Sequence, residues 1–412
     1  RPGTALAMKG VDLILNPSAS HFAFGKIEVR KRFVLEGSRA FCANYVYANL
    51  LGNEAGRAIY DGGALIASAG RLIAAGPRFG FHEFHVISAV LDVEATRLNQ
   101  ARTASYRPQV DSADDDPVRV PFEFPEVALA SPELGASAWE ASPHLKEEEF
   151  ARAEALALFD YLRRSRSRGF VVSLSGGADS SATSCLVHLM VAFGLKELGA
   201  GFIAKLDYIP GLAGESDARK LTRQLLTTVY QATENSGSVT RQAARAVADA
   251  VGSQHYEFEV GHLARGYLET VEKALGFKLN WKDHDLALQN IQARVRSPSA
   301  WMLANLKSAL LLATSNRSEA AVGYATMDGD TSGGLSPLAG IDKAWLRHWL
   351  RWLETTGPMG LSPITALAVA SPPAPRPKKE VPQRAVTVLL LTRHESVLVE
   401  RRPSSGIWGG LW

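Results

Sequence analysis

The sequence has few cysteines and almost no charge excess, and both absences exclude classes of protein. Its 412 residues contain two cysteines, Cys42 and Cys185, which is too few for the disulfide framework of a small secreted protein. Lysine and arginine number 45 against 42 aspartate and glutamate, giving a net charge of +3. Such a balance by itself requires neither nucleic acid nor an anionic membrane as a partner. We therefore expect a cytoplasmic protein whose partners must be inferred from local sites.

The sequence also suggests no membrane span and no signal peptide ahead of the first expected strand. With 46% hydrophobic and 21% charged residues, the composition is that of ordinary globular proteins. The length allows two or three domains, each with its own core. Because the chain starts at Arg1 and stops at Trp412 within an apparent strand region, we expect both ends to be truncated.

Residues 169–190 predict a strand, a glycine-rich loop and a helix in succession. The apolar run 169–174 leads into Ser175-Gly176-Gly177, and Asp179 and Ser180 open the helix. Backbone N–H groups of such a loop, together with a helix start, bind anions. The Gly-Lys-Ser/Thr of a Walker A loop is missing. The stretch predicts a phosphate-binding loop, and the alternative is a glycine-rich turn capped by Asp179 and Ser180.

A second polar region follows further along the chain. Residues 285–296, DLALQNIQARVR, predict a helix with Asn290 and Arg294 four positions apart on one face. An apolar strand at 310–313 then meets a polar strand end at 314–319. The alternation of strands and helices from 169 onward predicts a doubly wound, mostly parallel sheet, in which ligands bind beyond the carboxyl ends of the strands.

These pieces together resemble the synthetase domain of NAD synthetases. The matching motifs are SGGADS, QNIQARVR, TSNRSEAAVGYAT, GD and SPLAGIDK. The resemblance implies an adenine nucleotide α-hydrolase-like fold of the ATP pyrophosphatase type. It also implies the reaction: ATP adenylates the nicotinate carboxylate of deamido-NAD with loss of pyrophosphate, and ammonia then displaces AMP to form NAD. A homodimer through this domain is implied as well.

The resemblance also implies a role for each matching residue. Asp179 and Glu319 would bind Mg²⁺, which takes one or two carboxylates and keeps several waters. Lys343 would act with them in catalysis and contact ATP or the adenylate as a point charge. Arg294 is assigned to the dinucleotide, although Arg296 is the open alternative. The remaining implied contacts are Ser175, Gly176, Gly177, Ser180 and Thr314 for ATP, and Asn290 and Asp330, with Lys343, for deamido-NAD.

The first 105 residues resemble the C-terminal half of a nitrilase-like amidase domain, through NPSAS, YVYAN and DGGALIAS. We expect strands at 10–16, 44–49, 64–68, 71–76 and 84–91 and a helix at 29–43. In that family a Glu, a Lys and a Cys release ammonia from glutamine, and all three positions would fall before Arg1. We therefore expect this chain to use free ammonia unless those residues exist upstream. Cys42 is the alternative nucleophile, but no base is placed beside it, and we expect a small buried thiol.

The expected organisation has five segments. These are a partial nitrilase-like domain (1–105), a linker (106–143), the synthetase domain (144–370), a Pro-rich linker (371–382) and a tail (383–412). The tail resembles the opening of the Nudix-like domain of A/G-specific adenine glycosylases and is too short for a core of its own. Two other functions stay open: an ATP pyrophosphatase acting on another nucleotide or a tRNA base, and a DNA-repair accessory module that uses the tail.

Overall fold

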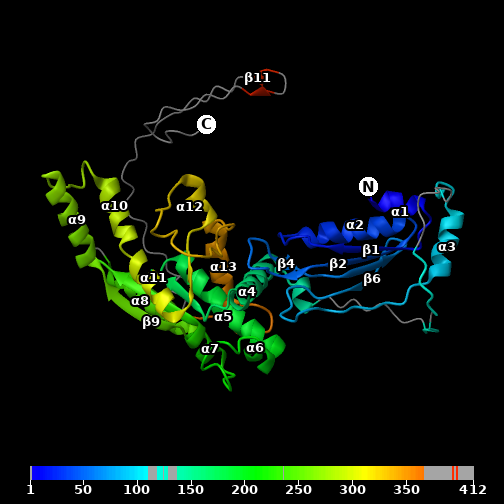
Figure 1. The fold of residues 1–412 in the computed structure, drawn as a ribbon, viewed down its shortest axis with the longest axis horizontal. Coiled ribbons are helices and arrows are strands. Elements are labelled where there is room, and N and C mark those ends of the chain that lie inside the picture. Colours follow the sequence, from blue (N-terminus) through cyan, green and yellow to red (C-terminus); the bar gives the residue numbers. More distant parts are fainter. Residues whose placement is uncertain are drawn as a thin grey trace. The chain divides into compact units, whose positions relative to one another are not determined.

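The computed structural model describes residues 2–109, 118–123, 125–128, 137–234 and 236–365, together with 392–393 and 396–397 (Figure 1). The contacts between residues divide the chain into two compact units, 1–370 and 371–412. In the second unit, β11 (Thr392–Arg393) and β12 (Ser396–Val397) pair antiparallel. The segment predicted as a Pro-rich linker, most of the segment predicted as a glycosylase-like tail and much of the predicted 106–143 linker lie outside the described residues.

The first sheet is built from residues 13–75. Its order is β1-β2-β5-β6, with β1 parallel to β2 and the other neighbours antiparallel. Helix α2 joins the two parallel strands and packs Val34 against Tyr47, Leu65 and Ala67. The strand predicted at 44–49 is confirmed. The elements of this region are α1 (Pro2–Met8), β1 (Leu13–Ser18), α2 (Lys26–Ala40), β2 (Asn44–Asn49), β3 (Leu51–Gly52), β4 (Tyr60–Asp61), β5 (Leu65–Ser68), β6 (Arg71–Ala75) and α3 (Val93–Arg102).

The strand predicted at 84–91 is wrong, because that segment has no regular secondary structure. Phe84 and Val86, which the apolar pattern assigned to a sheet, are 74% and 80% exposed. An apolar run forms a strand only where a neighbour accepts its backbone hydrogen bonds. Here β6 is the last strand of its sheet, and no pairing extends to these residues.

The second sheet confirms the expected parallel, doubly wound architecture. Its order is β10-β7-β8-β9, and all its neighbours are parallel. Alternate residues of a strand face opposite sides of a sheet, and helices cover both sides here. Phe170 and Val172 join the core formed with α4 (Leu145–Ser165), α5 (Ala178–Leu198), α8 (Ser238–Val251) and α13 (Lys343–Thr355). Val171 packs on the other side, against Ala300 and Ala304 of α11 (Ser297–Lys307). The strands are β7 (Phe170–Ser173), β8 (Leu226–Ala232), β9 (Gln254–Glu259) and β10 (Leu310–Leu312).

One helix around this sheet, α5 (Ala178–Leu198), is predicted as a helix by the sequence but continues beyond the predicted end at residue 190. Helix α5 has 21 residues and the length and composition of a membrane span, yet most of its apolar window is buried in the fold. Ala182, Leu186 and Met190 are fully buried in the core, so α5 is a core helix. The helical elements of this region are η1 (Ala138–Ala141), α4 (Leu145–Ser165), α5 (Ala178–Leu198), α6 (Ala200–Ala204), α7 (Ala218–Leu225), α8 (Ser238–Val251), α9 (Gly261–Leu275), α10 (Asp285–Arg294), α11 (Ser297–Lys307), α12 (Arg317–Val322) and α13 (Lys343–Thr355).

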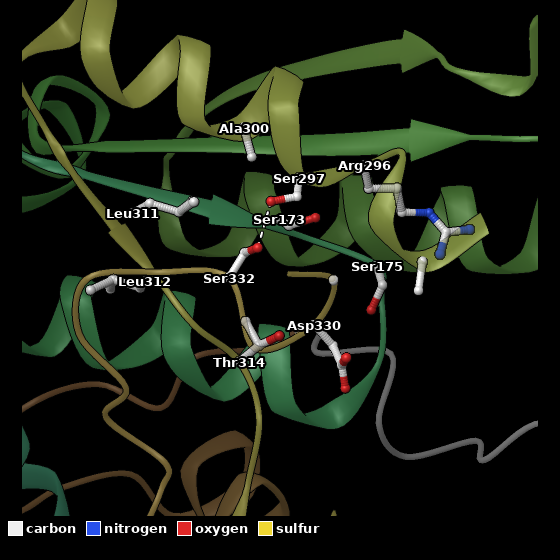
Figure 2. Close-up of a pocket in the computed structure, with 12 residues that line it drawn as sticks. Ser173, Ser175, Arg296, Ser297, Ala300, Leu311, Leu312, Thr314, Asp330 and Ser332 are labelled. Atoms are coloured by element: carbon white, nitrogen blue, oxygen red, sulfur yellow. Dashed lines mark hydrogen bonds between the residues drawn. The ribbon is translucent and has the colours of Figure 1, made fainter. Parts of the chain in front are cut away.

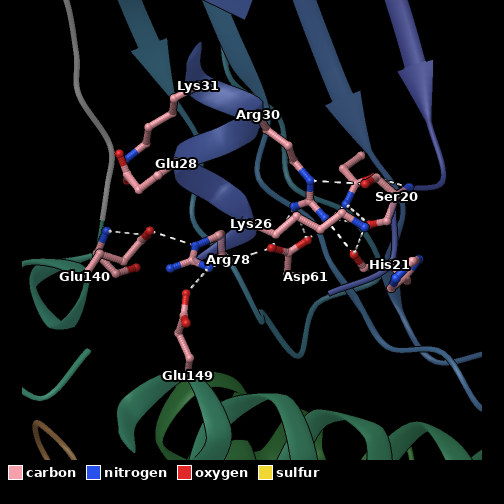
Figure 3. Close-up of polar contacts among 12 residues, drawn as sticks. Ser20, His21, Lys26, Glu28, Arg30, Lys31, Asp61, Arg78, Glu140 and Glu149 are labelled. Atoms are coloured by element: carbon pink, nitrogen blue, oxygen red, sulfur yellow. Dashed lines mark hydrogen bonds and ion pairs between the residues drawn. The ribbon is translucent and has the colours of Figure 1, made fainter. Parts of the chain in front are cut away.

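A buried set of ion pairs, the Arg78 network, ties the first sheet region to α4 (Figure 3). Arg78 Nη1 lies 2.8 Å from Glu149 Oε1 on α4 and 3.7 Å from Asp61 Oδ2, and its Nε lies 2.8 Å from Glu140 Oε2. Arg30 Nη1 contacts Asp61 Oδ1 at 2.6 Å. Burial alone would lower the pKa of Arg78, but the carboxylates of Glu140 and Glu149 outweigh it and raise that pKa. Arg78 therefore keeps its charge, and its ion pairs join the first sheet region to α4.

Candidate functional site

Close packing and hydrogen bonds define the shape of the glycine-rich loop. Gly176 has a φ of +78°, and a Cβ built there would lie 2.6 Å from the carbonyl oxygen of Thr240, so only glycine fits. The Ser180 hydroxyl lies 3.2 Å from the Ser175 N–H and 3.1 Å from the Ser175 Oγ. Ser181 donates to the Gly177 carbonyl at 2.8 Å. These contacts hold the loop at the start of α5, as the sequence predicted.

A cavity of about 240 Å³ opens beside this loop (Figure 2). Because β7 and β10 are parallel neighbours, their carboxyl ends place Ser175 and Thr314 in the same wall. The start of α11 forms another wall, and the loop carrying Asp330 closes the cavity. Of the residues assigned to the site from the sequence, Ser175, Thr314 and Asp330 line the cavity. The complete lining is Ser173, Ser175, Ala293, Arg296, Ser297, Ala300, Leu311, Leu312, Thr314, Gly329, Asp330 and Ser332.

The arginine that faces this cavity is Arg296 rather than the predicted Arg294. Helix α10 ends at Arg294 and α11 starts at Ser297, so the single helical face predicted for 285–296 is interrupted. The exposed Arg294 donates from Nε to the Met327 carbonyl at 3.0 Å. Arg296 is half-buried, and burial lowers its pKa. Within the described residues its guanidinium has no ion pair.

Three charged side chains predicted from different parts of the sequence meet near the loop. Lys343 Nζ lies 3.0 Å from Asp179 Oδ2 and 2.7 Å from Glu319 Oε1. Burial alone would lower the pKa of Lys343, but its hydrogen bonds to Glu319 and Asp179 raise it overall. The ammonium therefore neutralises two carboxylates that converge on a single point. Among the described residues, no group of three or more His, Cys, Asp or Glu side chains is arranged to hold a metal.

Asn316, which the sequence analysis did not single out, organises this cluster. It is 1% exposed, donates from Nδ2 to Asp179 Oδ1 at 2.8 Å and accepts from the Glu319 N–H at 3.0 Å. The polar strand end predicted at 314–319 is wrong in its second half, because Glu319 lies in the first turn of α12. Asparagine followed three residues later by glutamate is typical of a helix start, so the sequence itself contained the signal for the start of α12.

Thr326, like Met327 beside it, ties the loop after α12 to α10. The Thr326 N–H donates to Asp330 Oδ1 at 2.7 Å, and its hydroxyl donates to Asn290 Oδ1 at 3.3 Å. Asn290 is thus close to the site but does not line the cavity. Ser297 and Ser332, neither of which was predicted, join the two walls through hydroxyls 2.5 Å apart.

Cys42 is not the buried thiol that we expected. It is half-exposed with a φ of +46°, and its Sγ lies 3.8 Å from the Arg39 carbonyl and 3.9 Å from the Thr103 hydroxyl. Neither group is a base, so the pairing that an activated nucleophile requires is not formed by these contacts. Cys185 is fully buried, and burial raises the pKa of its thiol.

A glycine-rich loop at the end of a central parallel strand, beside the polar end of its neighbour, defines an α/β protein with its site at the carboxyl edge of the sheet. The family model described as NAD synthase matches residues 151–366, just over half of the chain. This chain belongs to the NAD synthase family.

Several relatives match most of this chain. Glutamine-dependent NAD(+) synthetases of Oryza sativa subsp. indica and Mus musculus are 33% and 32% identical over 85% of the chain, which covers 50% and 51% of them. The chain therefore spans about half the length of the curated relatives it matches. A glutamine-dependent NAD(+) synthetase of Cytophaga hutchinsonii has a TM-score of 0.69 at 44% identity, over 85% of this chain and 53% of that one. The Acinetobacter baumannii enzyme in complex with ADP has a TM-score of 0.63 at 20% identity, over 90% of this chain and 56% of that one, and supports the fold.

Proposed function

We propose that this chain is an NAD synthetase that uses ATP to adenylate deamido-NAD and ammonia to amidate the product. One observation carries the proposal: the NAD synthase match spans 151–366 and includes every residue lining the cavity and the whole Lys343 cluster. The relatives named glutamine-dependent NAD(+) synthetases support the same reaction.

The proposed reaction has two steps. A carboxylate oxygen of the nicotinate ring attacks the α-phosphorus of ATP, and the bond between this phosphorus and the pyrophosphate oxygen breaks. Ammonia nitrogen then attacks the activated carbonyl carbon, the carbon–oxygen bond to AMP breaks, and the nitrogen gives up a proton. Both steps move negative charge onto leaving phosphates, so positive groups and N–H donors fixed near them lower the barrier.

The residues present suit those demands. The loop formed by Ser175, Gly176, Gly177 and Ser180 offers backbone and hydroxyl donors to the phosphates of ATP, and Thr314 faces the same cavity. Arg296 contributes a positive charge with no competing ion pair in the described residues. Asp330 shares its cavity, and Asn290 and Arg294 lie around the 326–330 loop. The cavity is smaller than most ligand sites, so we assign to it only part of a dinucleotide.

We propose Asp179 and Glu319 as the residues that would hold Mg²⁺. Their carboxylates converge on Lys343 Nζ, and two carboxylates with room for phosphate oxygens match the preference of this ion. When bound, Mg²⁺ would neutralise charge on the phosphates. Lys343 would then exchange its two carboxylates for a phosphate oxygen of the nucleotide.

We propose the first sheet region as the C-terminal half of a nitrilase-like domain. Its β1-β2-β5-β6 order and the relatives' glutamine dependence support this assignment. For the residues of this chain we propose ammonia as the nitrogen donor, since in the described part of the chain neither Cys42 nor the buried Cys185 contacts the partners of a glutamine-cleaving nucleophile. The domain boundaries at 105, 143 and 370 stay predictions.

We also propose that the chain forms a homodimer through its second sheet region. Helix α9 exposes an apolar stripe made of Leu263, Tyr267, Val271 and Leu275, which are four residues apart and so share a face. The same helix carries Arg265, Glu269 and Lys273, so charges of both signs are available for pairing across a two-fold axis. Light scattering should give twice the chain mass for the wild type and a monomer for Tyr267→Glu. A monomeric wild type would contradict the proposal.

The NAD synthase match disfavours an ATP pyrophosphatase with another acceptor, because the match includes the helix and loop that would select the acceptor. The DNA-repair reading depends on the tail, which lies almost entirely outside the described residues. Duplex binding with a steep dependence on salt would favour it.

The deciding experiment measures AMP and NAD formed from deamido-NAD and Mg-ATP, with ammonium in one reaction and glutamine in another. We expect product with ammonium alone. Product with glutamine would contradict the assignment of the nitrogen donor and leave the synthetase reaction standing. A folded chain that forms neither AMP nor NAD in either reaction would overturn the proposed function.

A further inference from the structure

Gln231 lies directly behind the cavity and contacts two elements that form it, β7 and the start of α11. It is on β8, is 5% exposed, and does not line the cavity. Its Nε2 donates to the Arg296 carbonyl at 2.6 Å and to Ser299 Oγ at 2.9 Å, and its Oε1 accepts from Ser173 Oγ at 2.5 Å. A buried amide on a central strand is costly unless all its polar groups are paired. In Gln231 both amide hydrogens and the amide oxygen form hydrogen bonds.

The orientation of the Gln231 amide is dictated by its partners. The Arg296 carbonyl can only accept, so the group facing it must be the NH₂. The oxygen then faces Ser173, whose hydroxyl can donate. Ser299 adds a second donor to the same Arg296 carbonyl at 3.0 Å. The main chain at Arg296 is therefore held from two sides, by a strand and by the first turn of α11.

This support matters because the Arg296 side chain has little else to orient it. No carboxylate among the described residues pairs with its guanidinium, although Figure 2 shows it extending along the cavity toward Ser175. An arginine side chain without an ion pair has many rotamers open to it. Its direction is set mainly by where the backbone carries its Cα and Cβ.

We propose that Gln231 is a positioning residue that fixes the main chain at Arg296, so that the guanidinium meets an anionic group of the bound dinucleotide. The identity of that ligand rests on the proposed function. The hydrogen bonds of Gln231 reach both Ser173, at the end of the strand that carries the phosphate loop, and the arginine. They thus set the spacing between the two anion-binding parts of the cavity.

The test is a double-mutant cycle with Gln231→Met and Arg296→Met, read by calorimetric binding of deamido-NAD. Methionine matches glutamine in length and removes the amide. We expect Gln231→Met to weaken binding about fivefold, as for the loss of one net hydrogen bond, and Arg296→Met about 10- to 100-fold, as for a charged one. The double variant should bind as Arg296→Met does, within about twofold, because Gln231 acts only through Arg296. In turnover, KM should rise while kcat changes little.

Thr228→Val is the matched control. Thr228 is buried on the same strand and contacts the Ser253 hydroxyl and His255 Nδ1, which do not line the cavity. This variant should lose stability without losing affinity. If Gln231→Met does not fold, Ser299→Ala removes one of the two donors to the Arg296 carbonyl and should weaken binding in the same direction. Unchanged affinity in the folded variant, or additive losses in the cycle, would overturn the inference.

A second readout separates this inference from the proposed function. Phenylglyoxal labels accessible arginines, and peptide mass spectrometry gives the rate at Arg296 without any nucleotide. We expect Gln231→Met to raise that rate severalfold and Thr228→Val to leave it unchanged. A wild type that does not bind deamido-NAD would contradict the proposed function only, and the labelling rate would still decide the role of Gln231. An unchanged rate in Gln231→Met would contradict that role.

Discussion

The clusters around Arg78 and Lys343 each bring a cation between carboxylates, and they differ in burial and in the kind of cation. Arg78 at the junction is 1% exposed and meets Asp61, Glu140 and Glu149. Lys343 at the site is 36% exposed and meets Asp179 and Glu319, which are 15% and 17% exposed. The first cluster is closed to water, and the second is open to it.

The difference shows that ion pairs of the same signs can stabilise the fold in one place and remain able to exchange partners in the other. The planar fork of arginine contacts several carboxylates in fixed directions, and the Arg78 guanidinium also lies 5.0 Å from the Trp139 ring and 5.3 Å from the Phe79 ring. Moving it would leave buried charges unpaired. The ammonium of Lys343 is a compact charge on a flexible stem, and water can replace it at little cost. The four predictions that follow test this contrast, from the largest expected effect to the smallest.

Replacing Arg78 by methionine should lower the free energy of unfolding by about 3–5 kcal/mol, because the buried Asp61 and Glu149 would lose a partner. Urea denaturation measures the change. The control is Arg97→Met: Arg97 is an exposed arginine that pairs with Asp12 and Glu94, and its removal should cost less than about 1 kcal/mol. If the two variants lost the same free energy of unfolding, burial would not explain the contribution of the Arg78 network.

Replacing Arg296 by methionine should give the opposite pattern to Arg78. We expect ligand binding to weaken by about 1.5–3 kcal/mol and the free energy of unfolding to stay the same or rise, since a half-buried charge without an ion pair is removed. Calorimetry and urea denaturation of the same preparation measure both quantities. A large loss of stability would mean that Arg296 is structural like Arg78.

Replacing Lys343 by methionine should increase the affinity of the Asp179–Glu319 pair for Mn²⁺ in the absence of nucleotide. Removing a positive charge about 3 Å from both carboxylates should strengthen binding by about tenfold or more, and electron paramagnetic resonance of free Mn²⁺ measures it. Because the pKa of Lys343 is raised, its ion pairs persist below the usual lysine pKa and are lost only as pH rises through the raised value. Wild-type Mn²⁺ affinity should therefore show no contribution from Lys343 titration between pH 6 and 9.

The smallest effect is expected at Glu83, a half-exposed residue near the junction. Hydrogen bonds from Arg163, 2.7 Å away, and from Lys205 lower its pKa to about 2. A lowered pKa contributes stability above the ordinary glutamate value, and this contribution is lost as pH falls toward 2. Glu83→Gln should cost no more than about 1 kcal/mol at pH 7, and thermal melts should show that cost shrinking between pH 5 and pH 3. A cost independent of pH would assign it to packing.

The sequence predicted the parts of the fold that depend on local pattern. Apolar runs bounded by glycine predicted β7 and the phosphate loop, and the spacing of strands and helices predicted the parallel sheet. The sequence could not decide between Arg294 and Arg296, because the helical periodicity of the residues continues across the break between α10 and α11. The Arg78 network was invisible for another reason: Arg78 and Glu149 are 71 residues apart, and no local pattern relates them. The roles assigned to the site residues stay predictions.

The strand order β10-β7-β8-β9 has a consequence for how the molecule assembles. Phe170 of β7 pairs with Leu226 on one side and with Leu310, 140 residues further along, on the other. Contacts between such distant segments form slowly, and a ribosome delivers β7, β8 and β9 before β10. The wall that carries Thr314 is therefore added last. We expect a newly made chain to pass through a stage in which most of the second sheet is formed and the cavity is still missing one side.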